Sequence, residues 1–250
     1  MSAIAAGFYR EWKIRVTNLT YIFYDLFYPL GYLLVFGVGV NAALGSPFST
    51  GGVDYNAFFL AGVLGMASFG IASNTAWGIF TDRDNGIFFE MLTYPLSRAQ
   101  FLAAKVLFNV GVAVLQALIT VVLAWRLLGV KIRFDLLPVL LAGVVAGTAG
   151  WFFFYAIFAL RIRRNDIFNT VTSIFYFVFL FASSMFYPIE PLPAWFRSMA
   201  LANPVTWHVD VLRYSTIGMG DPKQIALEGA AFVVFALISF AMAVKTLERE

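Results

Sequence analysis

Long stretches without charged residues are the feature that most limits how this chain can fold. A helix that crosses a bilayer needs about 20 mostly apolar residues in a row. Six windows approach this length, at residues 21–40, 57–80, 106–125, 136–160, 167–187 and 229–244, and the last is expected to begin earlier, near Ile225. Charged residues make up only 12% of the chain, against about 25% in a soluble domain. The chain therefore needs lipid as its solvent.

The six windows are predicted to be α-helices. Backbone groups in hydrocarbon must be hydrogen-bonded internally, and the alternating pattern of a membrane barrel is absent from the sequence. We expect an all-α membrane protein with about six transmembrane helices in a single domain over residues 1–250. It would carry an interfacial helix at its N-terminus and short outer-face helices before the last span.

The positions of Lys and Arg predict the orientation in the membrane. With the N-terminus inside, eleven of the 17 Lys and Arg residues lie on the cytoplasmic side, where such an excess is usual. Arg126, Lys131 and Arg133 count against this arrangement. We expect a multi-pass protein of the bacterial plasma membrane with both termini cytoplasmic and lipid as a partner. The net charge of +3 gives no reason to expect nucleic acid.

The first 20 residues are predicted to form a helix that lies in the membrane interface. Apolar side chains, Trp12 among them, are interleaved there with Arg10, Lys13 and Arg15. This mixture is typical of amphipathic helices at a lipid surface. A basic tail without regular structure is the alternative.

Residues 81–97 are predicted to be a cytoplasmic loop that contains a helix of its own. After a charged start, four apolar side chains recur at the spacing of a one-sided helical stripe. They are Ile87, Phe88, Met91 and Leu92. Pro95 ends this helix, and Ser97 with Gln100 forms a capping box for the next one. The additional helix indicates a docking surface, with a lid packed on the bundle as the alternative.

Residues 188–223 are too polar to span the membrane and too rich in aromatic residues and Pro for a free loop. Aromatic side chains favour the headgroup level of a bilayer. Short re-entrant or interfacial helices at the outer face are therefore expected here. Asn203 and Pro204 mark an internal turn.

The chain lacks the motifs that catalysis or nucleotide binding would need. It contains no Cys and no Gly-x-x-x-x-Gly-Lys-Ser/Thr loop, so neither thiolate chemistry nor nucleotide hydrolysis is expected of it. His208 is the only histidine, and no nucleophile stands beside it. We expect His208 to be structural, and we expect no metal site and no cofactor on this chain.

Polar side chains recur along one face of the fifth window. They are Asn169, Ser173, Tyr176, Leu180, Ser183 and Tyr187. A similar face of the second window holds Gly62, Met66, Gly70, Asn74 and Gly78. Polar groups inside a membrane bundle face either a partner helix or a cavity, and the pattern leaves both open. For Gly143 and Gly147 in the fourth window we expect close helix packing.

Two motifs resemble the membrane-spanning subunits of type-2 ABC exporters, which include exporters of polysaccharides, teichoic acids, nodulation factors and drugs. In residues 82–98, charged residues and a Gly lead to a Glu, a Leu, a Pro and a Ser-Arg pair. In residues 203–213, an Asn-Pro motif precedes the last span. Together with the six windows, the resemblance covers essentially the whole chain.

The resemblance implies that a separate cytoplasmic ATPase, which binds ATP and Mg²⁺, drives a unit with two copies of the permease. The helix at about residues 84–94 would couple to this ATPase through Asp84, Gly86, Phe88, Glu90, Met91, Leu92 and Pro95. Spans two and five would line the translocation path through Gly70, Asn74, Asn169, Ser173, Tyr176, Ser183 and Tyr187. The outer-face motif comprises Asn203, Pro204, Trp207 and His208.

We therefore expect a permease subunit, not itself an enzyme, that moves a lipid-linked, glycolipid, polysaccharide or hydrophobic substrate outward by alternating access. The aromatic fifth window suits a glycan channel, and the compact loops suit lipid or drug export equally. One alternative is a membrane-embedded glycolipid-modifying enzyme, which would need an ionisable cluster such as His208, Asp210 and Arg213. Another is a passive channel or assembly subunit, which leaves the docking helix unexplained.

Overall fold

The computed structural model describes residues 3–44, 53–87, 90 and 97–248, and these residues form helices joined by short connections, without strands. Five helices are long and apolar enough to cross a bilayer. They are Leu19–Ala43, α5 (Tyr55–Asp84), α7 (Arg98–Leu127), Phe134–Arg161 and α12 (Pro222–Leu247). A sixth apolar helix, α9 (Asn165–Phe181), is shorter. The prediction of an all-α membrane protein is confirmed.

The first span is a helix interrupted by two π-helical turns. It consists of α2 (Leu19–Ile22), η1 (Phe23–Phe27), α3 (Tyr28–Tyr32), η2 (Leu33–Gly37) and α4 (Val38–Leu44). Pro29 accounts for the first interruption. Its nitrogen has no hydrogen to donate to the carbonyl four residues earlier, and its ring would clash with that carbonyl. The wider turn just before Pro29 accommodates that clash.

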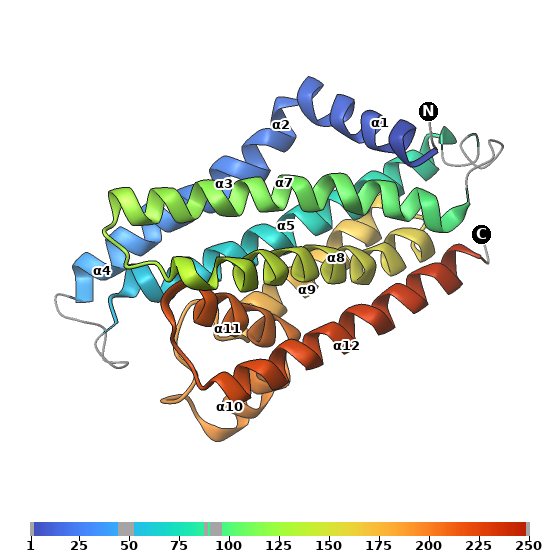
Figure 1. Ribbon diagram of the computed structural model, residues 1–250. Helices are drawn as coiled ribbons and strands as arrows, with labels where there is room; N and C mark the ends of the chain where they lie inside the picture. The colour runs from blue at the N-terminus through green and yellow to red at the C-terminus, as the bar shows by residue number, and fades with distance from the viewer. Residues whose placement is uncertain (1–2, 45–52, 88–89, 91–96, 249–250) are drawn as a thin grey trace.

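The α5 helix is the centre of the bundle, and 89% of its most apolar 18-residue window is buried. It packs against α8 (Leu137–Arg161), which follows the short turn η3 (Phe134–Leu136), and against α11 (Pro204–Ile217). The α8 helix in turn packs against α12 (Figure 1). Small residues permit these contacts, since a Cβ on Gly65 of α5 would lie 2.7 Å from the Cγ2 of Val209 on α11.

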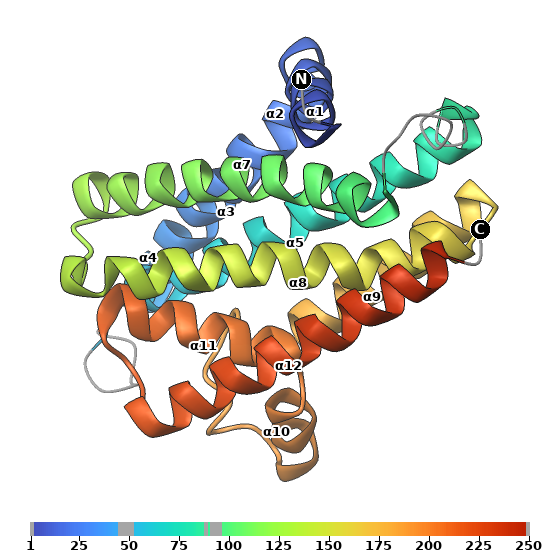
Figure 2. The ribbon, with the colours of Figure 1, turned by 45° about the vertical axis from the view of Figure 1, so that its right-hand side comes forward.

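The N-terminal helix α1 (Ala3–Thr17) crosses the bundle axis rather than running along it. Figure 2 shows α1 nearly end-on while α7 extends across the picture. The chain turns at Asn18, whose side chain caps α2 by accepting a hydrogen bond from the Thr20 N–H at 3.1 Å. An interfacial position for α1 fits this geometry. The end of the bundle where α1 lies is called the α1 end below.

The predicted boundaries fail at two places. The helix of the fifth window ends at Phe181, so residues 182–187 leave the helix and the predicted stripe is cut before Ser183 and Tyr187. The carbonyls of Phe179 and Ala182 instead accept hydrogen bonds from the side-chain amide of Asn203. The second correction concerns Thr81 to Asp84, which form the last turn of α5 rather than the start of a loop.

The segment before the last span contains two helices, as expected. They are α10 (Ala194–Leu201) and α11. Pro204 stands at the first position of α11, and Gly218 ends it with a φ of +74°, a left-handed conformation that suits glycine. The capping box of α7 is also present, with reciprocal bonds of 2.9 and 3.1 Å between Ser97 and Gln100.

Candidate functional site

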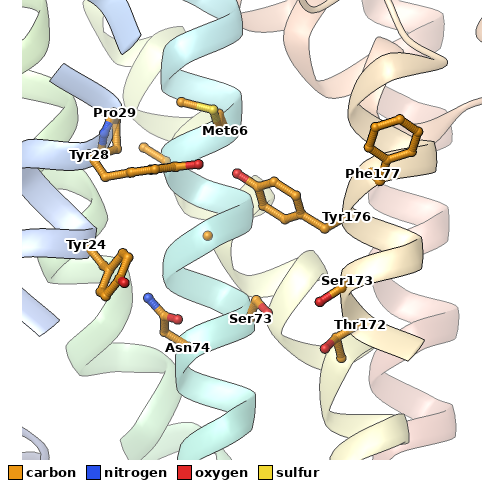
Figure 3. A pocket seen from close by; sticks show the side chains of 12 residues that line it. Tyr24, Tyr28, Pro29, Met66, Ser73, Asn74, Thr172, Ser173, Tyr176 and Phe177 are labelled. Carbon is orange, nitrogen blue, oxygen red and sulfur yellow. The ribbon is translucent and has the colours of Figure 1, made fainter. Parts of the chain in front are cut away.

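A cavity of about 440 Å³ lies between the first span, α5 and α9 (Figure 3). Three separate segments of the chain line it. They contribute Tyr24, Tyr28 and Pro29; Met66, Ala67, Gly70, Ser73 and Asn74; and Thr172, Ser173, Tyr176 and Phe177. Figure 3 shows the hydroxyl groups of Tyr28 and Tyr176 pointing toward one another across this cavity.

The cavity brings together four of the seven residues predicted for a translocation path. Gly70 and Asn74 from α5 face Ser173 and Tyr176 from α9. The other three lie elsewhere. Asn169 is exposed near the start of α9 and bonds to Asn165 at 3.0 Å.

Ser183 and Tyr187 lie beyond the end of α9 and do not line the cavity. The Ser183 hydroxyl is fully buried and donates to the Leu180 carbonyl at 2.6 Å. The Tyr187 hydroxyl donates to the Phe181 carbonyl. Both side chains serve to close the end of the helix.

Sequence reasoning missed the contribution of the first span. Tyr24, Tyr28, Tyr32 and Phe36 recur every four residues, and their rings form a ladder with centroids 5.0 to 6.2 Å apart. The wider π-helical turns keep this spacing on one face. Tyrosines repeated at four-residue spacing inside an apolar window were the available signal.

The lining of the cavity mixes polar and apolar side chains and is uncharged. Among the described residues that line it, none carries an ionisable acid or base other than the tyrosine hydroxyls. Hydroxyl and amide groups such as those of Ser73, Asn74 and Ser173 offer hydrogen bonds, and the tyrosine rings offer flat apolar faces. The site can hold an uncharged group that has both polar and apolar surfaces.

A buried ion pair is hydrogen-bonded to Asn74, one of the residues that line the cavity. Asn74 donates from its amide to Asp25 of the first span at 3.3 Å, and Asp25 pairs with Arg15 of α1 at 3.1 Å. Arg15 also bonds to Asn109 of α7. One lining residue is thus connected through two charged side chains to the interfacial helix.

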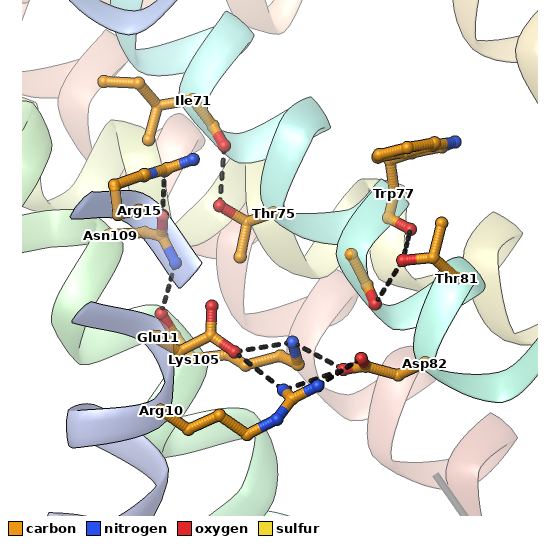
Figure 4. Close-up of polar contacts among 11 residues, drawn as sticks. Arg10, Glu11, Arg15, Ile71, Thr75, Trp77, Thr81, Asp82, Lys105 and Asn109 are labelled. Carbon is orange, nitrogen blue, oxygen red and sulfur yellow. Dashed lines mark hydrogen bonds and ion pairs between the residues drawn. The ribbon is translucent and has the colours of Figure 1, made fainter. Parts of the chain in front are cut away.

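A second group of charges binds α1 to the bundle at the α1 end (Figure 4). Lys105 of α7 pairs with Glu11 of α1 at 2.7 Å and with Asp82 of α5 at 3.0 Å. Arg10 of α1 forms a bidentate pair with the same Asp82. Burial disfavours the charged form of Arg10, but the hydrogen bond and charge of Asp82 outweigh this and raise its pKa. The four side chains therefore form a charged clamp, named the α1 clamp below.

The predicted coupling residues fall only partly within the described chain. Asp84 ends α5 at the surface, and Gly86 takes a φ of +76°, which only glycine adopts without strain. Glu90 is exposed and helical, with its N–H bonded to the Gly86 carbonyl at 3.3 Å. The remaining residues lie outside the described residues; they are Phe88, Met91, Leu92 and Pro95.

The outer-face motif is a packing unit. The Asn203 amide donates to the carbonyls of Phe179 and Ala182, and its oxygen caps α11 by accepting from the Val205 N–H at 2.9 Å. Trp207 donates from its indole N–H to the Leu201 carbonyl at 2.7 Å.

His208 is only 2% exposed, and both ring nitrogens have partners within the bundle. Neither nitrogen is therefore available to act on a substrate. This argues against the alternative of a membrane-embedded enzyme built around His208, Asp210 and Arg213. The described residues also contain no group of three His, Asp or Glu side chains that could hold a metal ion.

Comparison with known families agrees with this architecture. The sequence model of the ABC-2 type transporter family matches residues 2–217. The chain belongs to the ABC-2 type transporter family. It is accordingly a transmembrane subunit of an ABC transporter, and its multi-pass helices are those of a permease.

Similar curated proteins carry the name "Putative transport permease ycf38". That of Cyanophora paradoxa is 24% identical over 197 residues, which cover 74% of this chain and 64% of the relative. That of Porphyra purpurea is 22% identical over 208 residues, which cover 83% and 70%. The chain thus spans somewhat less than two thirds of the first relative's length.

Proposed function

We propose that this ABC-2 permease is the membrane subunit of an ATP-driven exporter and that the cavity between the first span, α5 and α9 is part of its translocation path. The observation that carries the proposal is the meeting of Gly70 and Asn74 with Ser173 and Tyr176, which lie about 100 positions apart in the sequence. A cavity with polar side chains among membrane-spanning helices is where a transported group would lie.

The uncharged lining sets the chemistry of the transported group. A charged group would have to enter a membrane cavity without a compensating side chain, at a high desolvation cost. We propose a lipid-linked, glycolipid, polysaccharide or hydrophobic substrate whose portion in the cavity is neutral. Alternating access of this cavity would move it outward.

The energy for transport is proposed to come from a separate cytoplasmic ATPase that binds ATP and Mg²⁺. It would dock at the α1 end, where Asp84, Gly86 and Glu90 lie. We propose that both termini lie in the cytoplasm and that the membrane is a bacterial plasma membrane. A second copy of the permease would complete the path, since Tyr24, Tyr28 and Phe36 of the ladder are exposed in one copy.

Site-directed labelling tests the path, because the chain contains no Cys and single cysteines report cleanly. Ser173→Cys points into the cavity, and Ile174→Cys, the next residue and 57% exposed, is the matched control outside it. The permease is purified with whatever ATPase accompanies it, placed in vesicles and treated with a membrane-impermeant maleimide.

We expect Ser173→Cys to react, at a rate that changes on addition of ATP, and Ile174→Cys to stay unlabelled in lipid. Equal rates at the two positions, with or without ATP, would contradict a water-accessible path. ATP-driven transport would be contradicted if the permease purifies without an ATPase and its rate of labelling does not change when nucleotide is added.

A further inference from the structure

A second hollow lies on the other side of the first span, away from the cavity. This groove of about 420 Å³ runs between α1, the first span and α7. Apart from Arg15, Asp25 and Gln116, its lining is apolar or glycine. The apolar and glycine positions are Phe8, Trp12, Val16, Ile22, Leu26, Phe108, Gly111, Val112, Leu115 and Ile119.

The groove extends along α7 beyond residues 104–109, where α1 contacts it. A Cβ on Gly7 would lie 2.7 Å from the Cβ of Ala104, so the two helices are in close contact there. The rings of Phe8 and Phe108 follow, edge to face at 5.2 Å. Further along, the chain turns at Asn18 into the first span, which forms the other wall of the groove. A wedge is left between the helices.

The depth of the groove corresponds to one leaflet of a bilayer. Lys105 and Arg126 of α7 are 21 positions apart, which is about 32 Å along a helix and close to the ~30 Å thickness of a hydrocarbon core. The groove follows α7 over residues 108–119, about 16 Å. It begins three residues after Lys105 and so lies mainly in the half of the hydrocarbon core nearer the α1 end.

The rim of the groove faces lipid. Trp12, Val16 and Leu115 are 46%, 52% and 61% exposed, and on a membrane-spanning bundle such side chains contact acyl chains. Water would find no hydrogen-bond partners in an apolar wedge at this depth. An empty wedge would leave its lining side chains without van der Waals contacts. An acyl chain is the apolar molecule that the surroundings supply.

The polar end of the groove carries an unsatisfied donor. The Nε of Arg15 is buried and has no hydrogen-bond partner, although one terminal nitrogen of the same guanidinium, Nη2, contacts both Asp25 and Asn109. Phosphate and ester oxygens of a lipid are acceptors that suit this nitrogen.

We propose that the groove binds one resident phospholipid of the leaflet at the α1 end. One acyl chain lies along α7, and glycerophosphate oxygens accept from the Arg15 Nε. The lipid fills the wedge and holds α1 against the first span. This site is separate from the translocation path, because it lies on the opposite face of the first span from Tyr24 and Tyr28.

Photolabelling in nanodiscs tests the site with a defined probe. The probe is phosphatidylglycerol with a diazirine at the middle of one acyl chain. Gly111→Leu fills the groove without a clash, since a Cβ at Gly111 meets no atom within 4 Å. Gly39→Leu in the first span is the matched control, because it is equally open and lies outside the groove.

We expect labels on α1 and on residues 108–119 in the wild type and in Gly39→Leu, and their loss in Gly111→Leu. Native mass spectrometry should show one phospholipid retained by the first two and none by the third. Equal labelling of Gly111→Leu, or labels spread evenly to lipid-facing positions such as Val122, would overturn the proposal. Loss of the label when ATP is added would identify the lipid as cargo and would overturn a resident role.

Discussion

The imidazole of His208 on α11 lies directly against the Cα of Gly147 on α8, so closely that a Cβ at Gly147 would overlap the Nε2 and Cε1 atoms. The indole N–H of Trp151 donates to Nδ1 at 3.4 Å, which leaves the proton on Nε2 to be donated to the Gly143 carbonyl at 3.2 Å. The ring also stacks on Phe232 at 5.0 Å. The small residues of α8 thus make room for a histidine that joins three helices.

This contact predicts that Gly147→Ala destabilises the protein. Alanine is the better helix former, but the overlap with His208 forces side chains or backbone to move, which typically costs about 1–3 kcal/mol. Thermal unfolding in detergent, followed by tryptophan fluorescence, measures the change. Gly31→Ala is the control, since a Cβ there meets nothing within 4 Å and stability should hold or rise. A Gly147→Ala protein as stable as wild type would refute the packing account.

The α1 clamp predicts that Asp82→Asn loosens α1. The substitution leaves Arg10 and Lys105 with Glu11 as their only acidic partner in the clamp, and breaking a buried ion pair costs about 3–5 kcal/mol. Hydrogen exchange should rise along α1 before the rest of the bundle unfolds. Asp84→Asn, exposed and two residues further on, should leave the exchange of α1 unchanged. Uniform protection in both variants would show that the apolar contacts of α1 hold it without the clamp.

The proposed docking of an ATPase predicts a specific effect of Glu90→Ala. Loss of this exposed carboxylate near the end of α5 should lower ATP hydrolysis by the complex, while membrane insertion and the melting temperature stay unchanged. An exposed carboxylate at the opposite end of the bundle, removed in Asp135→Ala, provides the comparison and should keep wild-type hydrolysis. If the two variants hydrolyse ATP equally, Glu90 has no part in coupling.

The end of α9 separates two serines that the sequence places on one stripe. Ser173→Trp should fill the cavity and block transport while the protein still folds. Ser183→Trp should instead lower the yield of folded protein, because Ser183 is fully buried and closes the helix through the Leu180 carbonyl. Transport assays on vesicles and size-exclusion profiles of the two variants distinguish these effects. Loss of transport by a well-folded Ser183→Trp protein would indicate that Ser183 does line the translocation path.

The spans could be read from the sequence because each needs a long uncharged stretch, and the helix start at Ser97 could be read because caps are local. The end of α9 could not be foreseen. It depends on Asn203, more than 20 residues later, which takes the carbonyls of Phe179 and Ala182. Helical periodicity predicts only which residues of one helix share a face. It contains no information on a hydrogen-bond partner as distant in the sequence as Asn203.

The residues of the candidate site, too, could be predicted only in part from the sequence. The polar faces of α5 and α9 were visible as helical stripes, and four of their residues meet in the cavity. The tyrosines of the first span were not included, although their four-residue spacing was visible in the sequence. The link from Asn74 through Asp25 to Arg15 joins three helices, and only the folded chain brings these side chains together.

The two roles of Asn203 can be separated by substitution. Asn203→Ser keeps an acceptor that caps α11 but loses both amide donors, and unsatisfied buried carbonyls cost about 1–3 kcal/mol each. Asn203→Asp keeps the cap as well, yet directs a carboxylate at two carbonyl oxygens, so it should be less stable than Asn203→Ser at neutral pH. Its melting temperature should rise as the pH falls, because a protonated carboxyl can donate one of the lost hydrogen bonds. Wild type and Asn203→Ser, melted over the same pH range, are the references. An Asn203→Asp protein that matches Asn203→Ser at every pH would mean that the carbonyls of Phe179 and Ala182 do not depend on this side chain.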